Sequence, residues 1–339
     1  MRSLKIHLKN VLFAIATLLV VLWLYSVRDA PSLYREGRVV FDTVVSVKFY
    51  GGELERVKLT DMAFDSFVMV DSLMSSYRSK SEISLISNNS GGWVNCSKET
   101  IEVLQRAKYW AQVTGGAYDP TIGCLTMAWK FHDRKSVPGD SKIDSLISCV
   151  DFEQLELKGQ KVRVNIDGLQ IDLGGAAKGY AVDHAVSRLE AAGVENGLIE
   201  AGGDIRYWGS KPDGTSWRIA VQHPRKPDSF IEVEDIGLKA IATSGDYQQY
   251  FIKEGKRYHH ILDPQTGWPS TPTISTTIWA RTAMDADILA TAVFVLGEEK
   301  GLQLAESLSD VEALVFTGTP EGYRVKSTTG LLGRFRIVD

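Results

Sequence analysis

The sequence is poor in cysteine and has no marked excess of either charge. Only Cys96, Cys124 and Cys149 occur in 339 residues, and they lack the C-x-x-C spacing of zinc-binding or redox motifs. We interpret them as small thiols, wholly or partly buried. A formal net charge of −4 gives no general attraction for a phosphate backbone, which counts against nucleic acid as a partner. With 44% apolar and 24% charged residues, the composition is that of a globular protein.

The N-terminal segment departs from this composition. Three basic residues at positions 2, 5 and 9 precede an uncharged run at 10–27, which is almost wholly apolar. This order is typical of an export signal or membrane anchor. No clean small-x-small cleavage site closes the run, and no cysteine for N-terminal lipidation lies near it. We therefore predict a retained membrane-anchor helix at 1–29, with a cleaved signal as the alternative. Either outcome places the rest of the chain at the extracytoplasmic (periplasmic) face of the inner membrane.

The remaining chain is predicted to form one unit. Residues 30–37 are interpreted as a polar tether, and 38–339 as a single catalytic domain without repeats or low-complexity tracts. Strands are predicted at 39–50, 197–201, 217–221, 239–243, 258–262, 276–280 and 311–317. Helices are predicted at 53–73, from after Ser97 to before Gly115, and at 176–192, 283–296 and 298–308. A hairpin is predicted at 161–173, turning at Asp167-Gly168. Helices mixed with hairpins, without regular βαβ alternation, predict an α+β fold.

The first chemical cluster is the sequence IDLGGAAKGY at 171–180, where a predicted strand passes into a helix. The glycines at 174 and 175 allow a phosphate to approach the backbone. The N–H groups of the helix N-terminus and the ammonium of Lys178 favour negative charge. The alternative is a tight strand-to-helix connection with an exposed lysine.

The second cluster is RYHHILDPQTGWP at 257–269. His259 and His260 are adjacent on a predicted strand, so their side chains face opposite ways and only one can line a given pocket. A histidine there can accept a proton from a nucleophile near neutral pH. The alternative is an ordinary strand histidine that hydrogen-bonds the turn beginning at Asp263.

The third cluster is DADILAT at 285–291. On a helix, Asp287 and Thr291 share a face because they are four residues apart. A carboxylate and a hydroxyl are hard oxygen ligands that suit Mg²⁺. Asp285 and Asp287 lie near the predicted helix start, so the alternative is that they only cap it.

Taken in order, these clusters and four further blocks resemble one family. The further blocks are SSYR with SEIS at 75–84, GGAYDP at 115–120, AGGD at 201–204 and ATSGDY at 242–247. Residues 41–296 thereby resemble the ApbE family of FAD:protein FMN transferases, whose folds have mixed or antiparallel sheets packed with helices. One departure is Phe41-Asp42-Thr43, where many relatives carry Met-Gly-Thr.

The resemblance implies an activity and a set of site residues. Such enzymes use FAD as a substrate, cleave its diphosphate, release AMP and leave FMN esterified to a threonine of a target protein. Mg²⁺ is expected at the backbone carbonyl of Gly175 and the side chains of Asp287 and Thr291. FAD is expected at Phe41, Ser76, Tyr77, Arg78, Ala117, Tyr118, Asp119, Asp172, Lys178, His260 and Leu262.

The transfer of FMN to threonine requires a residue that accepts the hydroxyl proton. A neutral threonine hydroxyl needs a base, for which His260 is the first candidate and Asp287 or Asp263 a weaker one. The expected acceptors are subunits of membrane redox complexes or secreted FMN-carrying domains. Two alternatives are an Mg²⁺-dependent FAD diphosphatase, in which water replaces threonine, and a non-catalytic flavin-binding protein.

Overall fold

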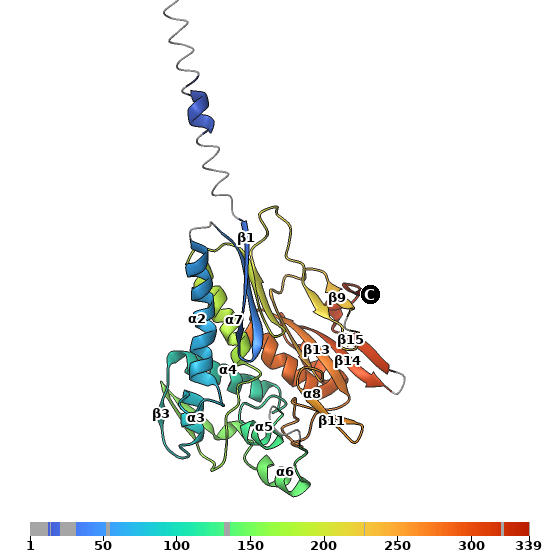
Figure 1. Ribbon diagram of the computed structural model, residues 1–339. Coiled ribbons are helices and arrows are strands. Elements are labelled where there is room, and N and C mark those ends of the chain that lie inside the picture. Colours follow the sequence, from blue (N-terminus) through green and yellow to red (C-terminus); the bar gives the residue numbers. More distant parts are fainter. Residues whose placement is uncertain are drawn as a thin grey trace, which may run out of the picture.

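The computed structural model describes residues 13, 15–20, 32–51, 55–131, 136–226, 228–319 and 322–338. Its centre is an eight-stranded antiparallel sheet in the order β1-β2-β6-β7-β10-β13-β14-β15 (Figure 1). Its strands are β1 (Ser32–Val40), β2 (Thr43–Gly51), β6 (Gly197–Ala201), β7 (Asp204–Trp208), β10 (Ala240–Gly245), β13 (Thr273–Ala280), β14 (Glu312–Thr319) and β15 (Gly322–Ser327). The mixed α+β prediction with antiparallel sheets is confirmed.

Three smaller sheets surround the central one. They consist of β3 (Val94–Asn95), β4 (Leu155–Lys158) and β5 (Lys161–Val164); of β8 (Ala220–Gln222), β9 (Phe230–Val233) and β16 (Phe335–Val338); and of β11 (Tyr250–Lys253) with β12 (Lys256–His259). The predicted strands 217–221 and 258–262 overlap β8 and β12 only at one end.

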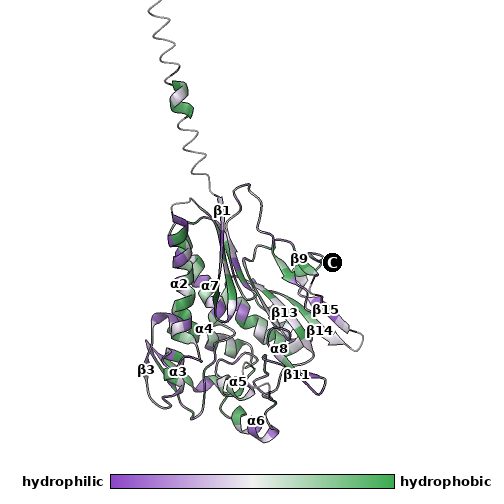
Figure 2. Ribbon diagram, viewed as in Figure 1, coloured by the Kyte–Doolittle hydropathy of each residue, from purple (hydrophilic) through white to green (hydrophobic). Residues whose placement is uncertain are grey.

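Helices cover one face of the central sheet. The α-helices are α2 (Arg56–Met74), α3 (Glu82–Ser87), α4 (Lys98–Val113), α5 (Gly123–Trp129), α6 (Asp140–Ile147), α7 (Ala177–Ala191) and α8 (Ala283–Ser307). Helix α2 carries both hydrophobic and hydrophilic residues (Figure 2), and its buried side chains pack with those of α7, α8 and the sheet in the main core. The other face of the sheet is covered by a second core that includes residues of β8 and β9. Apolar burial on both faces is the driving force for this layered arrangement.

Most of the predicted helices are present. The two helices predicted around Gly297 are the two halves of α8, which Gly297 interrupts with φ 75° and ψ −175°. That backbone conformation is open to glycine and strained for other residues.

The strand predicted at 39–50 is wrong in its limits, because the chain reverses inside it. Strands β1 and β2 pair from Val40 opposite Thr43, so Phe41-Asp42 is a two-residue turn with φ of 55° and 54°. Positive φ at both central residues suits the right-handed twist of a hairpin, although glycine usually occupies such a turn. Residues 32–37, interpreted as tether, belong to β1.

The hairpin predicted at 161–173 is also wrong. Strand β5 pairs instead with β4, which precedes it, and Gly159-Gln160 forms the turn. The segment after Gly168 contributes only an isolated parallel bridge between Ile122 and Gln170. Its alternating apolar residues at 169, 171 and 173 are buried in the main core. Burial, not strand pairing, therefore accounts for their pattern.

The predicted anchor at 1–29 lies largely outside the described residues. Positions 13 and 15–20 are helical and exposed. Across the described part of the chain, no helix has the length and apolar character needed to span a membrane.

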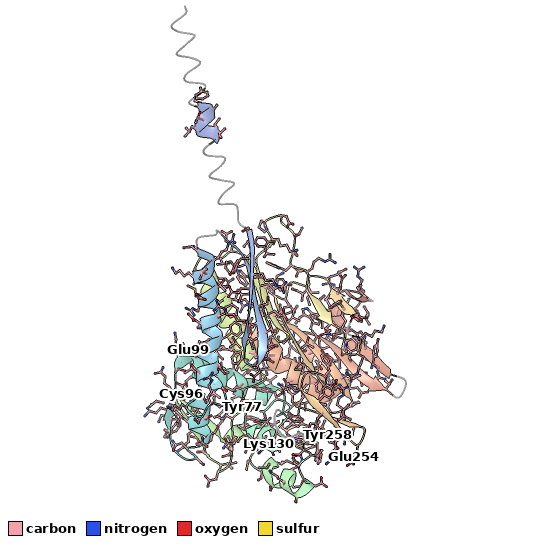
Figure 3. All side chains as sticks on the ribbon, viewed as in Figure 1. Tyr77, Cys96, Glu99, Lys130, Glu254 and Tyr258 are labelled. Atoms are coloured by element: carbon pink, nitrogen blue, oxygen red, sulfur yellow. The ribbon has the colours of Figure 1, made fainter. Side chains whose placement is uncertain are left out.

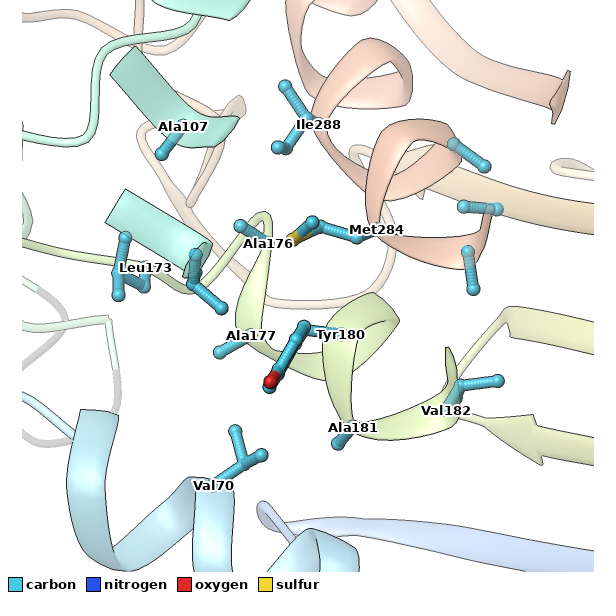
Figure 4. Packing of buried hydrophobic residues seen from close by; sticks show 14 of the residues in the cluster. Val70, Ala107, Leu173, Ala176, Ala177, Tyr180, Ala181, Val182, Met284 and Ile288 are labelled. Atoms are coloured by element: carbon cyan, nitrogen blue, oxygen red, sulfur yellow. The ribbon is translucent and has the colours of Figure 1, made fainter. Parts of the chain in front are cut away.

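Helices α7 and α8 approach each other unusually closely. A Cβ atom at Gly179 would lie 2.3 Å from the carbonyl oxygen of Ala283, so only glycine permits this contact. Small residues of α7 and the preceding turn pack nearby against Met284 (Figure 4). Asp183 of α7 also accepts hydrogen bonds of 2.9 Å from the N–H groups of Ala283 and Met284, at the start of α8. The two helix starts are thereby fixed side by side.

Candidate active site

The turn before α7 lies against the third turn of α8. An ideal Cβ atom at Gly175 would lie 3.0 Å from Oγ1 of Thr291 and 3.3 Å from the Tyr118 ring. The Thr291 hydroxyl is also 3.4 Å from Oγ of Ser244 on β10. Residues more than 100 positions apart in the sequence therefore meet, as the proposed metal site requires.

A buried group of three charges lies beside this contact. Nζ of Lys178 is 2.9 Å from Oδ2 of Asp204 and 3.3 Å from Oδ2 of Asp287. The N–H of Gly179 lies 3.4 Å from the same Asp287 oxygen. One ammonium thus faces two carboxylates, and the group carries an excess of negative charge when all three are ionised.

Two members of this group, Asp204 and Lys178, have shifted pKa values. Burial, together with the charge of Asp287, raises the pKa of Asp204 well above its ordinary value. Burial alone lowers the pKa of Lys178, but the charges of Asp204 and Asp287 outweigh it, and the net pKa is raised. The lysine is therefore a fixed cation at neutral pH.

Tyr118 lies beneath the turn before α7 and does not present its ring to solvent. It is 4% exposed. Among the described residues, no group forms a hydrogen bond with its buried hydroxyl. Burial, followed by the nearby charge of Asp287, raises the pKa of Tyr118 well above its usual value. The hydroxyl is therefore neutral near pH 7.

Two further carboxylates hold the loops around the site. Asp172 accepts hydrogen bonds of 2.8 Å from Thr126 Oγ1 and from the N–H of Gly174. Asp119 accepts bonds from the N–H and hydroxyl of Thr121, at 2.8 and 2.6 Å. Burial raises the pKa of Asp119. Both residues order the backbone on which the site is built.

The two adjacent histidines have different surroundings. His259 is buried, and its Nε2 donates to the carbonyl of Ser270 at 2.9 Å while its Nδ1 accepts the N–H of Ile261. Burial lowers the pKa of His259. His260 is half-buried, and its Nδ1 lies 3.3 Å from the carbonyl of Gln249. A carbonyl can only accept, so Nδ1 of neutral His260 carries the proton and Nε2 carries the lone pair.

Asp263 is occupied by a turn. Its carboxylate accepts the N–H of Gln265 at 2.9 Å, and its carbonyl accepts the N–H of Gly267 at 2.8 Å. This position suits a structural role better than that of a base.

Asp285 is separate from the cluster around Asp287. Its carboxylate oxygens lie 2.6 and 2.7 Å from the Arg106 guanidinium, and Trp110 Nε1 donates to it at 2.6 Å. The cap of α8 is Thr282, whose hydroxyl accepts the N–H of Asp285. Neither Asp285 nor Asp287 caps the helix through its side chain, so that alternative is wrong.

The other expected flavin positions differ in exposure. Tyr77, which is labelled in Figure 3, is 78% exposed. Ala117 and Leu262 are buried, and Ser76 is half-buried. Arg78 forms an ion pair of 2.5 Å with Asp71. Phe41 packs edge-on against Phe67 of α2, with ring centroids 6.2 Å apart.

Sequence reasoning assigned no role to Asp204, Ser244 or Thr126. The first two lie in the blocks AGGD and ATSGDY, so their place in the resemblance was the available signal. Thr126 lies in none of the blocks, and only the fold shows its contact with Asp172.

The pattern of the ApbE family matches residues 41–315, which is most of the chain and includes every cluster described above. The chain belongs to the ApbE family. An FAD:protein FMN transferase of Vibrio cholerae is 36% identical over 261 residues, covering 75% of this chain and 78% of the relative. One of Treponema pallidum is 30% identical over 330 residues and covers 90% of each chain.

Solved ApbE structures share the fold. The flavin transferase ApbE of Vibrio cholerae superimposes with a TM-score of 0.81 at 29% identity, covering 90% of this chain and 99% of that one. The ApbE protein of Thermotoga maritima has a TM-score of 0.80 at 30% identity, covering 90% and 100%.

Proposed function

We propose that this chain cleaves FAD and transfers FMN to a threonine hydroxyl of a target protein, with release of AMP, in an Mg²⁺-dependent reaction outside the cytoplasm. Membership of the ApbE family and its transferase relatives support the activity. The observation that carries the metal dependence is that Gly175 lies against Thr291, while Asp287, one turn earlier in α8, lies against Gly179 of α7. The basic and apolar N-terminus supports the proposed membrane anchor and location.

The chemistry of the donors fits Mg²⁺. Among the described residues, no three His, Cys, Asp or Glu side chains form a metal-binding group. The proposed ligands are a single carboxylate, a hydroxyl and the Gly175 carbonyl, all hard oxygens, with phosphate and water completing the shell. When both carboxylates are ionised, Asp204 and Asp287 outnumber the single ammonium of Lys178, which favours a cation there. When bound, Mg²⁺ neutralises and orients the diphosphate.

The residues of this chain bind the diphosphate and move one proton. The N–H groups of Ala177 and Gly179 at the start of α7 already donate to Leu173 and Asp287, so the ammonium of Lys178 is the group of this turn that would bind phosphate oxygens. His260 Nε2 takes the threonine proton as the hydroxyl oxygen bonds to the phosphorus of the FMN half. The bond from that phosphorus to the bridging oxygen breaks, and AMP leaves. FAD is consumed as a substrate and undergoes no redox change.

The closeness of Gly175 to Thr291 gives a specific expectation. In Gly175→Ala, the added methyl group would press on the Thr291 hydroxyl at 3.0 Å and displace a metal ligand. We expect the Mg²⁺ concentration for half-maximal transfer to rise about 10-fold, as for other disturbed ligand shells. A Mg²⁺ titration of transfer measures this, with Gly139→Ala as the control, because a Cβ atom there would meet nothing within 4 Å. An unchanged titration would show that Thr291 does not bind the metal.

Co-expression with a flavin-acceptor domain tests the function. The intact mass of an exported acceptor should rise by one FMN ester, and replacement of its target threonine by valine should prevent the rise. An acceptor retained in the cytoplasm should stay unmodified. Free FMN and AMP without a modified acceptor would instead indicate the diphosphatase, and unchanged FAD would indicate a flavin-binding protein.

A further inference from the structure

Asp204 occupies an unusually well-defined position beside the proposed metal site. It is the first residue of β7 and pairs with Ala201 across the two-residue turn Gly202-Gly203, whose φ angles are 56° and 100°. Such a turn requires positive φ at both central residues, which glycine adopts without strain. The side chain of Asp204 is 2% exposed. Its backbone and its carboxylate are therefore both fixed.

The Asp204 carboxylate acts on Lys178. Nζ of Lys178 lies 2.9 Å from Asp204 but 3.3 and 3.5 Å from the two oxygens of Asp287. A lysine has a flexible four-carbon stem, and its ammonium settles where the nearest carboxylate holds it. Three elements thus contribute one group each: α7 the ammonium, β7 the nearer carboxylate and α8 the farther one.

We propose that Asp204 is a positioning residue for the transfer reaction: it retains the Lys178 ammonium and so leaves the Asp287 carboxylate available to Mg²⁺. The inference rests on the proposed function. Without Asp204, the closest carboxylate to Lys178 is Asp287, and the ammonium competes with the metal for the same oxygens. In this role Asp204 acts through its contact with Lys178 and is not a ligand of the substrate or the metal.

Asp204 can also act on the metal site directly, through its negative charge, without Lys178. A buried carboxylate near a cation site also favours the cation through its charge alone. In that case, loss of Asp204 weakens metal binding equally with and without Lys178. If Asp204 acts through Lys178, the loss of Asp204 weakens metal binding only while Lys178 is present. A double-mutant cycle distinguishes the two because it measures the coupling between the residues.

The experiment measures Mn²⁺ binding by electron paramagnetic resonance, with FAD at a concentration that saturates each variant. Asp204→Asn should weaken Mn²⁺ binding about 10-fold or more, as loss of a residue that orients a ligand does. The same change in a Lys178→Met background should have little effect. Equal weakening in both backgrounds, or none in either, overturns the inference. Should Asp204→Asn not fold, Asp204→Ser in both backgrounds gives the same comparison.

Two further variants separate this inference from the proposed function. Asp287→Ala should abolish Mn²⁺ binding at the site, and its failure to do so would count against the metal site itself. Asp285→Asn is the matched control. It also removes a buried carboxylate charge from α8, but that carboxylate pairs with Arg106. It should lower stability and leave Mn²⁺ binding unchanged. Circular dichroism and thermal unfolding confirm that each variant is folded.

Discussion

Asp287→Ala is expected to reduce flavin transfer roughly a thousandfold. Asp287 is the only carboxylate among the three proposed Mg²⁺ ligands, and its side chain is 6% exposed. Charge neutralisation by a metal is worth several kcal/mol in the transition state, and about 1.4 kcal/mol corresponds to a tenfold rate change. The change also leaves Lys178 beside Asp204 alone. Initial rates of acceptor modification, followed by flavin fluorescence in denaturing gels across a range of Mg²⁺, measure the effect.

A milder change at the neighbouring ligand strengthens this test. Thr291→Val keeps the shape of the side chain and removes only its hydroxyl. We expect a loss of about 10- to 100-fold that higher Mg²⁺ partly restores. Asp285→Asn, in the same helix, should leave the Mg²⁺ response as it is. Unchanged transfer in both Asp287→Ala and Thr291→Val would refute the metal site.

The approach of Gly175 to Thr291 follows a prediction from the sequence, whereas two of the predicted strand arrangements are wrong. The sequence blocks are short, but some lie at places where the backbone itself is constrained, such as the turn at Gly175 or the contact at Gly179. Such positions restrict residue type strongly, so the blocks remain recognisable. Helical pairs such as Asp287 and Thr291 also follow from spacing alone.

The predicted strands are wrong where one local sequence pattern can have two physical causes. Phe41-Asp42 turns the chain without glycine, so the β1–β2 reversal gave no turn signal. The alternation at 169–173 looked like a strand, but buried loops beside a core show it as well. The partner of β5 is in fact local, across the two-residue turn Gly159-Gln160, but Asp167-Gly168 is an equally good turn signal on the other side of the same strand.

The role of Asp204 could not be predicted from spacing at all. Its block AGGD indicates a tight turn, yet nothing near it in the sequence points to Lys178, 26 residues earlier. Only the antiparallel pairing of β6 with β7, and the packing of α7 on them, bring the two charges together. Long-range ion pairs are a product of topology, and the sequence shows them only as isolated charged residues.

His260→Ala is expected to leave FAD binding nearly unchanged and to slow transfer about 100-fold or more, the usual contribution of a general base. The hydrogen bond from Nδ1 to the Gln249 carbonyl leaves the lone pair on Nε2, which suits proton acceptance. The buried His259 cannot substitute, since both of its ring nitrogens are engaged.

The comparison that isolates this role uses His184 of α7, also a half-buried histidine, whose ring lies against Tyr180. His184→Ala should transfer FMN at the normal rate. Quenching of FAD fluorescence measures binding, and single-turnover modification of the acceptor measures transfer. If His260→Ala transfers normally, the proton goes elsewhere, and Asp287 becomes the remaining candidate base because Asp263 is held in its turn. If FAD binding falls in parallel with transfer, His260 holds the flavin instead of moving the proton.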